Sequence, residues 1–279
     1  MNVQIREIEE ISIITTVYNH GDTIRDALDS ILMQQTSRLF HVYCLNDAST
    51  DNSGAILEEY QKRHPDKITV FTNKINQGTG KKSILKNKPP VRGKYWTLLD
   101  GDDFWTASDK IEKQISILEK NPKSQGCSSH TVVRNEQTGE KSIIKPSFDR
   151  WNLMDLALGV NGLYVHPSSI IWRNTFLKKG NFFPRAFIQT EQKGDWLLLH
   201  MSLASGGCIV NYPEVTSCYR VTGRGVWTML SGQEQDALNK NMRKFILAWL
   251  PLKYAIGCKV IKSQTLRKFA GIFPQPLTQ

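Results

Sequence analysis

Hydrophobic positions near the start of the chain switch between two spacings. Residues 11–17 form a short, continuous run of mostly β-branched and apolar residues, which is typical of a buried strand. Over residues 24–32 the apolar positions instead recur at intervals of three and four, as on the buried face of a helix. A strand followed by an amphipathic helix is the unit from which parallel sheets are built.

The same switch repeats along the first half of the chain. Apolar runs predict further strands at residues 40–45, 68–71 and 95–99, and helical stripes recur at 56–60 and 111–118. Strands that alternate with helices imply right-handed βαβ units. The predicted fold class is therefore α/β, with a mixed, mainly parallel sheet flanked by helices.

The pattern becomes less regular after about residue 147. Residues 151–158 predict a helix, 168–172 a strand and 196–203 a buried helix. A clear helical stripe returns at 242–250 and is followed by a tail of lysines, arginines and apolar residues. We interpret this stripe as a helix packed on the rest of the protein. The alternative is a surface element that rests on anionic lipid.

Composition narrows the class of protein. Of the 279 residues, 40% are hydrophobic and 22% charged, as in ordinary globular domains, and the net charge is +10. A basic excess suits nucleic acid, an anionic membrane or phosphorylated substrates, and does not choose among them. Because no basic motif with interleaved aromatic residues is present, nucleic acid is not an expected partner.

Cysteine usage and hydropathy indicate the compartment. The five cysteines are widely spaced and form no C-x-x-C pair, which argues against a disulfide framework and against a thiolate zinc site. The first ten residues are polar and charged, so we expect no signal peptide, and no apolar run is long enough for a spanning helix. We expect a cytoplasmic protein, with peripheral contact at the inner face of the membrane as the alternative.

Polar residues follow four of the predicted strands. Tyr18 and Asn19 come after the first strand, Asn46 and Asp47 after the second, residues 73–80 after the third, and the acidic segment 100–103 after the fourth. In parallel sheets ligands collect outside the carboxyl ends of the strands. These side chains are therefore the candidates for a binding site.

The acidic segment, Leu-Leu-Asp-Gly-Asp-Asp-Phe-Trp over residues 98–105, is the sharpest local motif. Its carboxylates Asp100, Asp102 and Asp103 repel one another, and a divalent cation would offset that repulsion. Oxygen ligands with room for diphosphate oxygens suit Mg²⁺ or Mn²⁺. The alternative is an acidic turn, with Gly101 in a left-handed conformation and Asp102 capping a helix.

Four motifs occur in a fixed order along the chain. They are the Tyr-Asn end of the strand at 11–19, Asn46-Asp47-Ala48-Ser49-Thr50-Asp51, Asn76-Gln77-Gly78 and Leu99-Asp100-Gly101-Asp102-Asp103. The ordered set, over residues 11–228, resembles the family 2 glycosyltransferases, whose catalytic domain has the Rossmann-like GT-A fold. The continuation of the acidic motif through Lys110, Lys113 and Gln114 resembles a bacterial branch, of the kind that makes polysaccharide or lipopolysaccharide.

The resemblance implies a domain organisation. Residues 1–230 would form the catalytic domain, with a nucleotide-sugar half at about 1–105 and an acceptor half at 106–230. Residues 231–279 would form a C-terminal helical extension.

The resemblance also assigns roles to residues at the donor side. Where the family usually has Ala-Arg-Asn, this chain has Gly-Lys-Lys-Ser, so Lys81 becomes a candidate phosphate contact, with a solvated loop as the alternative. The family pattern implies that Thr16 and Tyr18 border the nucleobase and that Asp47 accepts a hydrogen bond from it. It places Asn76 in the nucleotide loop and Asp102 at the ribose. Asp103 would ligate the metal, and Asp100 would contact the metal site indirectly.

The second half of the chain resembles the acceptor side. Asp195, in a Gly-Asp-Trp element with Trp196, would be the general base, or the N-cap of the following helix. Arg220 and Arg224 would cover the diphosphate, because the family's usual histidine is Thr222 here. His166 lies in a stretch that resembles the acceptor side, but before a proline we interpret it as a packed core histidine.

Together these matches predict an inverting glycosyltransferase that needs Mn²⁺ or Mg²⁺. The donor would be a nucleotide-diphosphate sugar, with uridine favoured only by the resemblance, and the acceptor a glycan or a lipid-linked polysaccharide precursor. The main alternative is a catalytically impaired nucleotide- or glycan-binding homologue. A sugar nucleotidyltransferase is disfavoured, because residues 15–19 contain no glycine for a phosphate loop.

Overall fold

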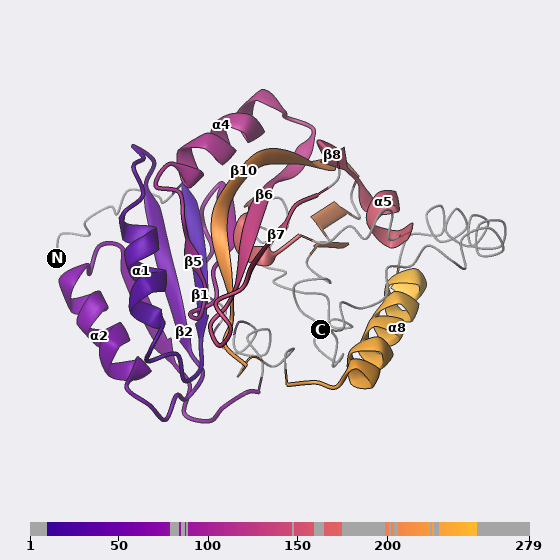
Figure 1. Cartoon of the computed structure of the whole chain (residues 1–279). Coiled ribbons are helices and arrows are strands. Elements are labelled where there is room, and N and C mark those ends of the chain that lie inside the picture. The colour runs from indigo at the N-terminus through magenta and orange to yellow at the C-terminus, as the bar shows by residue number, and fades with distance from the viewer. Residues whose placement is uncertain are drawn as a thin grey trace.

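The described residues form a ten-stranded mixed sheet at the centre of the molecule (Figure 1). Its main path runs β3-β2-β1-β4-β9-β6-β10-β5, with β7 beside β6 and β8 beside β10. The computed structural model describes residues 10–78, 84, 87, 89–146, 148–158, 165–174, 199–200, 202–203, 206–223, 225 and 229–249.

The first half of the chain confirms the predicted alternation of strands and helices. β1 pairs in parallel with both β2 and β4, and β2 pairs in parallel with β3, so all four strands end at the same edge. The elements are β1 (Ile11–Val17), α1 (Ile24–Leu32), β2 (Phe40–Asn46), α2 (Ser53–Arg63), β3 (Ile68–Thr72) and β4 (Tyr95–Leu98).

The second half adds mostly antiparallel pairs around one long parallel pair, β6 with β10. Sequence patterns did not predict these two strands. The elements are β5 (Phe104–Trp105), α4 (Lys110–Lys120), β6 (Ser124–Asn135), β7 (Lys141–Ile144), β8 (Arg150–Trp151), α5 (Leu153–Leu158), the 3-10 turn η2 (Pro167–Ser169), β9 (Ile171–Arg173) and β10 (Cys208–Val221).

Two predicted elements have different boundaries. Trp151 belongs to a strand rather than to the helix predicted over 151–158, because it pairs with Ile209 of β10. The strand predicted over 168–172 begins only at Ile171, because Pro167 starts a 3-10 turn before it. In the segment predicted as a helix over 196–203, the described residues 199–200 and 202–203 are helical.

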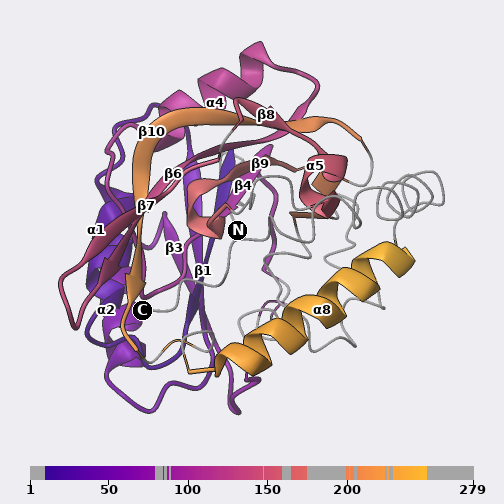
Figure 2. The same ribbon diagram turned by 45° about the vertical axis from the view of Figure 1, so that its right-hand side comes forward.

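Helices lie on both sides of the sheet. α1 and α2 lie side by side over the first strands, and α8 (Gly232–Trp249) stands on the opposite side, as both views show (Figures 1 and 2). α8 starts before the predicted stripe at 242–250 and is the described part of the predicted C-terminal extension. No helix among the described residues has the length and hydropathy needed to cross a membrane.

The core lies between the sheet and the predicted helical stripes. The apolar residues that form the stripes of α1, α2 and α4, such as Ile24, Leu57 and Ile115, are buried in one core with strand residues such as Ile13 and Val42. Burying each side chain of this size contributes about 1.5–3 kcal/mol, which makes the stripes the main reason that these segments are helical.

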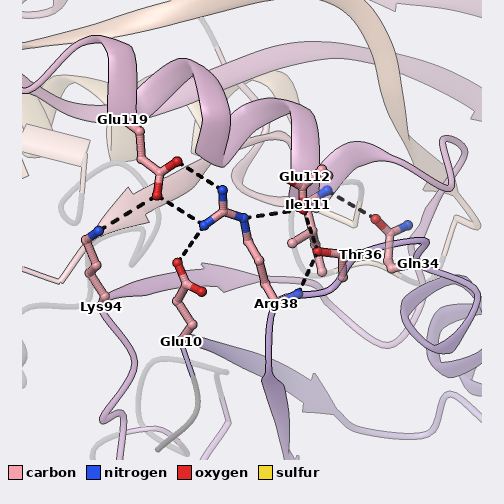
Figure 3. A network of polar contacts seen from close by, with 8 residues as sticks. All are labelled: Glu10, Gln34, Thr36, Arg38, Lys94, Ile111, Glu112 and Glu119. Carbon is pink, nitrogen blue, oxygen red and sulfur yellow. Dashed lines mark hydrogen bonds and ion pairs between the residues drawn. The ribbon is translucent and has the colours of Figure 1, made fainter.

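A cluster of ion pairs closes the amino-terminal edge of the sheet (Figure 3). Arg38, just before β2, donates to Glu10 at 2.7 Å and to both carboxylate oxygens of Glu119 at 3.0 and 3.1 Å, and its Nε lies 3.4 Å from Glu112. Burial lowers the pKa of Arg38, but the hydrogen bonds with Glu119 and Glu10 outweigh it and raise that pKa. The cluster ties α4 to the edge opposite the predicted site.

Replacing Arg38 with methionine should lower the free energy of unfolding by about 2 kcal/mol. The Arg38 side chain is only 15% exposed, and its removal leaves Glu10, Glu112 and Glu119 with Lys94, 3.8 Å from Glu119, as the cation that remains in the cluster. Urea denaturation measures the loss. Arg63→Met is the matched control: the Arg63 side chain is 58% exposed, so we expect a change of about 0.5 kcal/mol or less. Equal losses in the two variants would contradict the assigned role of the cluster.

Candidate functional site

Main-chain hydrogen bonds bring the loops after three strands together. The N–H of Asp47, after β2, donates to the carbonyl of Val17 at 2.8 Å. On the other side of β1, the N–H of Gly101 donates to the carbonyl of Thr16 at 2.9 Å. Asp47 and the acidic turn at 100–103 therefore flank the carboxyl end of β1, at the edge where the parallel pattern placed them.

The loops after β1 and β2 are locked to each other. Asn19 has a left-handed backbone with φ of 55°, and its side-chain Oδ1 accepts the N–H of Thr50 at 2.8 Å. Ala48 has φ of 59°, which costs an alanine roughly 1 kcal/mol and persists only where the surroundings hold it. Next to this locked pair, the Tyr18 side chain is 45% exposed. An aromatic face is thus presented to solvent from a rigid backbone.

Asp47 is buried and organises the loop after β3. Its carboxylate accepts the side-chain amide of Asn73 at 2.8 Å and the N–H of Gln77 at 3.0 Å to each oxygen. Asn76 is exposed in the same loop, and its side chain accepts the N–H of Gly78. A carboxylate has about four acceptor positions, so Asp47 can hold this loop and still accept one more donor.

Close packing explains the glycine in the acidic turn. A Cβ on Gly101 would lie 2.7 Å from Nδ1 of His20 and 3.2 Å from the carbonyl of Thr16. Gly101 is not left-handed and Asp102 caps no helix, so the alternative of a simple acidic turn is wrong on both points. Thr16 donates its hydroxyl to Asp100, which anchors the start of the turn on β1.

The two remaining carboxylates of the turn lie in different environments. The Asp102 side chain is 21% exposed, and its Oδ2 is 3.9 Å from Nε2 of His20. Asp103 is 2% exposed, and its Oδ1 accepts the main-chain N–H of Arg220 at 3.0 Å. Burial raises the pKa of Asp103 well above its usual range, and the charges of Asp102 and Asp100 raise it further. A cation beside this turn would favour the ionised form.

His166 is buried against the same carboxylate. Its ring stacks on Tyr219 with centroids 4.6 Å apart, and its Nε2 lies 3.7 Å from Oδ2 of Asp103. Burial lowers the pKa of His166 to about 3, so the imidazole is neutral at physiological pH. The interpretation as a buried histidine is confirmed. Its contact with Asp103 was not predicted, because only the tertiary structure brings the two together.

The Arg220 guanidinium is bound to carboxylates of the protein itself. It forms an ion pair with Asp26 of α1, lies 3.5 Å from Glu136 and stacks over the ring of Phe104 at 4.5 Å. Its main-chain N–H holds Asp103. These contacts favour a role in fixing the turn over the predicted role on a diphosphate.

Four predicted site residues lie outside the described part of the chain: Lys81, Asp195, Trp196 and Arg224. Within the described part, no three His, Cys, Asp or Glu side chains form a group that could hold a metal ion unaided. The carboxylate oxygens of the acidic turn do fit Mg²⁺ or Mn²⁺ in another way. Such ions are commonly held by one or two carboxylates, with substrate phosphates completing the coordination.

The carboxyl edge of this sheet gathers carboxylates and an exposed tyrosine, at the place where α/β enzymes bind their ligands. Residues 12–182 match the family described as glycosyl transferase family 2. The chain belongs to that family, as the motifs predicted.

One relative is similar over most of this chain. An uncharacterised protein of Mycobacterium tuberculosis, Rv1520, is 30% identical over 220 residues, which cover 78% of this chain and 60% of that protein. The chain thus spans about 60% of the length of this relative.

Two solved structures share the fold, which confirms the predicted α/β class. One is the crystal structure of S. aureus TarS 1-349 in complex with UDP-GlcNAc, with a TM-score of 0.65 at 17% identity. The aligned part covers 94% of this chain and 73% of the TarS chain. The mannosyltransferase PcManGT from Pyrobaculum calidifontis, in complex with GDP-Man and Mn²⁺, has a TM-score of 0.58 at 17% identity, and covers 96% and 77%.

Proposed function

We propose that this chain transfers a sugar from a nucleotide-diphosphate sugar to an acceptor hydroxyl, with inversion of configuration. The observation that carries the proposal is the meeting of Tyr18, Asp47 and the acidic turn at one edge of the sheet. Family membership and the UDP-GlcNAc complex of a structural neighbour support a nucleotide-sugar donor. A UDP-sugar is the first candidate, and the GDP-Man complex of the other neighbour makes GDP-sugars the second.

The nucleoside would lie between the loops after β1 and β3. The exposed ring of Tyr18 offers a stacking face, and the remaining acceptor position of Asp47 suits a base N–H. Thr16 and Asn76 would line the same pocket. Lys81 would meet a phosphate as a point charge.

The metal would bind at the acidic turn. Exposure favours Asp102 as the carboxylate that reaches the cation, because Asp103 is almost fully buried and already accepts the Arg220 N–H. Asp103 and Asp100 would then lie behind Asp102 and attract the cation through their negative charge. When bound, the cation stabilises the charge that grows on the departing diphosphate.

Asp195 would be the general base. Displacement at an anomeric carbon passes through an oxocarbenium-like state, and the attacking hydroxyl must lose its proton as the bond forms. A base on the face opposite the leaving diphosphate gives inversion. Trp196 and Arg224 would border the acceptor and the diphosphate.

The acceptor would be a glycan or a lipid-linked precursor in polysaccharide synthesis. The basic residues after α8 would bring the enzyme to the anionic inner face of a membrane. Residues 1–230 would form the catalytic domain, and 231–279 the helical extension.

A thermal-shift screen of UDP- and GDP-sugars with Mn²⁺ or Mg²⁺ tests the proposal. A donor at about 100 times its Kd should add about 2.7 kcal/mol of stability, which raises Tm by about 5 °C in a chain of this size. Chelation with EDTA should remove most of that shift, and free sugars should give none. If no nucleotide-sugar changes Tm with either cation, the proposal fails. An equal shift with EDTA would remove the metal from it.

A further inference from the structure

A lysine is completely buried beside the candidate site. Lys110, the first residue of α4, donates to the carbonyl of Ser169 at 3.1 Å, to the hydroxyl of Thr216 at 3.2 Å and to the side chain of Gln114. Its Nζ lies 5.5 Å from the centre of the Trp105 ring. Among the described residues, no carboxylate forms an ion pair with it. The ammonium is therefore held by three oxygen acceptors and one aromatic face.

Stability does not explain this arrangement. Burial lowers the pKa of Lys110 to about 7, which means that the protein disfavours the charge it encloses. Replacing buried charges with apolar side chains of similar volume is often neutral or stabilising. An apolar side chain could fill the same space, but it could not donate the three hydrogen bonds.

One of these bonds leads to the turn that carries His166. The N–H and the hydroxyl of Ser169 both donate to the carbonyl of His166, at 3.0 and 2.7 Å. The indole N–H of Trp105 donates to the carbonyl of Ser168 at 3.1 Å. Holding Ser169 therefore holds the whole turn, and with it the His166 ring that lies 3.7 Å from Asp103.

A second bond leads to β10. Thr216 lies on this strand four residues before Arg220, whose N–H donates to the other oxygen of Asp103. Between them on the strand, Tyr219 stacks on the His166 ring. The two elements that contact Asp103 therefore share the ammonium of Lys110 as an anchor, beside the Ser129 hydroxyl, which donates to the Ser169 carbonyl at 3.2 Å and pairs with the Thr216 hydroxyl.

We propose that Lys110 is a positioning residue of the donor site: its ammonium holds the His166–Ser169 turn and β10 in the arrangement in which His166 and the Arg220 N–H both contact Asp103. The kinetic consequence rests on the proposed function. The structural consequence does not, because the turn and the strand are there whatever the substrate.

The test compares Lys110→Met, which keeps the length and removes the donors, with Lys113→Met, an exposed lysine on the same helix. Thr216→Val, which removes the bond from Lys110 to β10 together with the Ser129–Thr216 hydroxyl pair, is the second variant and serves if Lys110→Met does not fold. In NMR spectra the Trp105 indole N–H, assigned with Trp105→Phe, reports the position of the turn through its bond to Ser168. Kinetics with the donor identified by the thermal-shift screen report the site.

We expect Lys110→Met to shift the Trp105 indole resonance and to lower kcat/KM by about 10- to 100-fold, the effect of misplacing a group by about 1 Å. Its Tm should stay within a few degrees of the parent's, and Lys113→Met should change neither readout. An unmoved Trp105 resonance in both Lys110→Met and Thr216→Val would overturn the proposal. So would unchanged kcat/KM in a folded Lys110→Met variant. If the parent transfers no sugar, the proposed function fails and the indole resonance alone decides the role of Lys110.

Discussion

The Asp195→Asn variant is expected to lose about a thousandfold in the rate of sugar transfer while it binds the donor as tightly as the parent protein does. Asparagine has nearly the same size as aspartate but cannot accept a proton from the acceptor hydroxyl. In the proposed function the donor would be bound away from Asp195, by Tyr18, Asp47 and the acidic turn. A general base therefore changes kcat and leaves the thermal shift by the nucleotide-sugar intact.

Asp149→Asn is the matched control for Asp195→Asn. Asp149 is exposed, and only its main chain makes a described hydrogen bond, to Asn211, so this variant should transfer sugar at the parent rate. Full transfer by Asp195→Asn would assign the base to another residue. A parent protein that binds the donor and transfers nothing would be the binding homologue instead of an enzyme.

The Asp103→Asn variant is expected to be more stable than the parent protein and nearly inactive. Without metal, an ionised Asp103 is buried next to two other carboxylates, and a neutral amide removes that cost while its oxygen can still accept the Arg220 N–H. We expect a gain of about 1–2 kcal/mol in the free energy of unfolding at neutral pH, and a loss of about a hundredfold or more in metal-dependent kcat/KM.

The stability difference between Asp103→Asn and the parent protein should depend on pH. Because the pKa of Asp103 is raised in the folded state, the native protein binds an extra proton between the unfolded pKa of about 3.9 and the folded one. The destabilisation is fully present above the folded pKa, shrinks as pH falls through it, and is gone below the unfolded pKa of about 3.9. Urea denaturation in EDTA should therefore show the gap between variant and parent closing toward low pH.

Asp66→Asn controls for the general effect of removing a negative charge from this basic protein. Asp66 is exposed, far along the chain from the acidic turn, and its replacement should change stability little at any pH. A stability gain of the same size in Asp66→Asn would attribute the effect to net charge. A less stable Asp103→Asn variant would contradict the cost assigned to the buried carboxylate.

Helical stripes and apolar strands were predictable because burial against a sheet imposes their periods directly. The residues of α1 that recur every three or four positions, such as Ile24 and Leu28, are fully buried. β6 and β10 escaped prediction because their facing side chains are hydroxyls. Ser129 pairs with Thr216, and Thr131 with Ser217, in the interior of the sheet. Hydrogen bonds between strands satisfy these polar groups, and a hydropathy pattern cannot register partners about 90 residues away.

The candidate site divides in the same way. Local motifs named the residues at the ends of β1, β2 and β4, because a strand end followed by Asn, Asp or Gly is visible in sequence. Which carboxylate of the acidic turn faces solvent was not visible. The sequence also did not show that the main-chain N–H of Arg220 donates to Asp103. Nor did it show that His166 lies next to the same carboxylate.

The sequence by itself determined the fold class, the family and the list of candidate carboxylates, since these depend on local periods and on short motifs in a fixed order. The tertiary structure alone decided the environments of those carboxylates. Asp102 is half-buried and accessible, whereas Asp103 is enclosed by β10 and the His166 turn. Burial and the charges of Asp102 and Asp100 raise the pKa of Asp103. Exposure, pKa and hydrogen-bond partners depend on which distant segments pack together, and no local pattern carries that information.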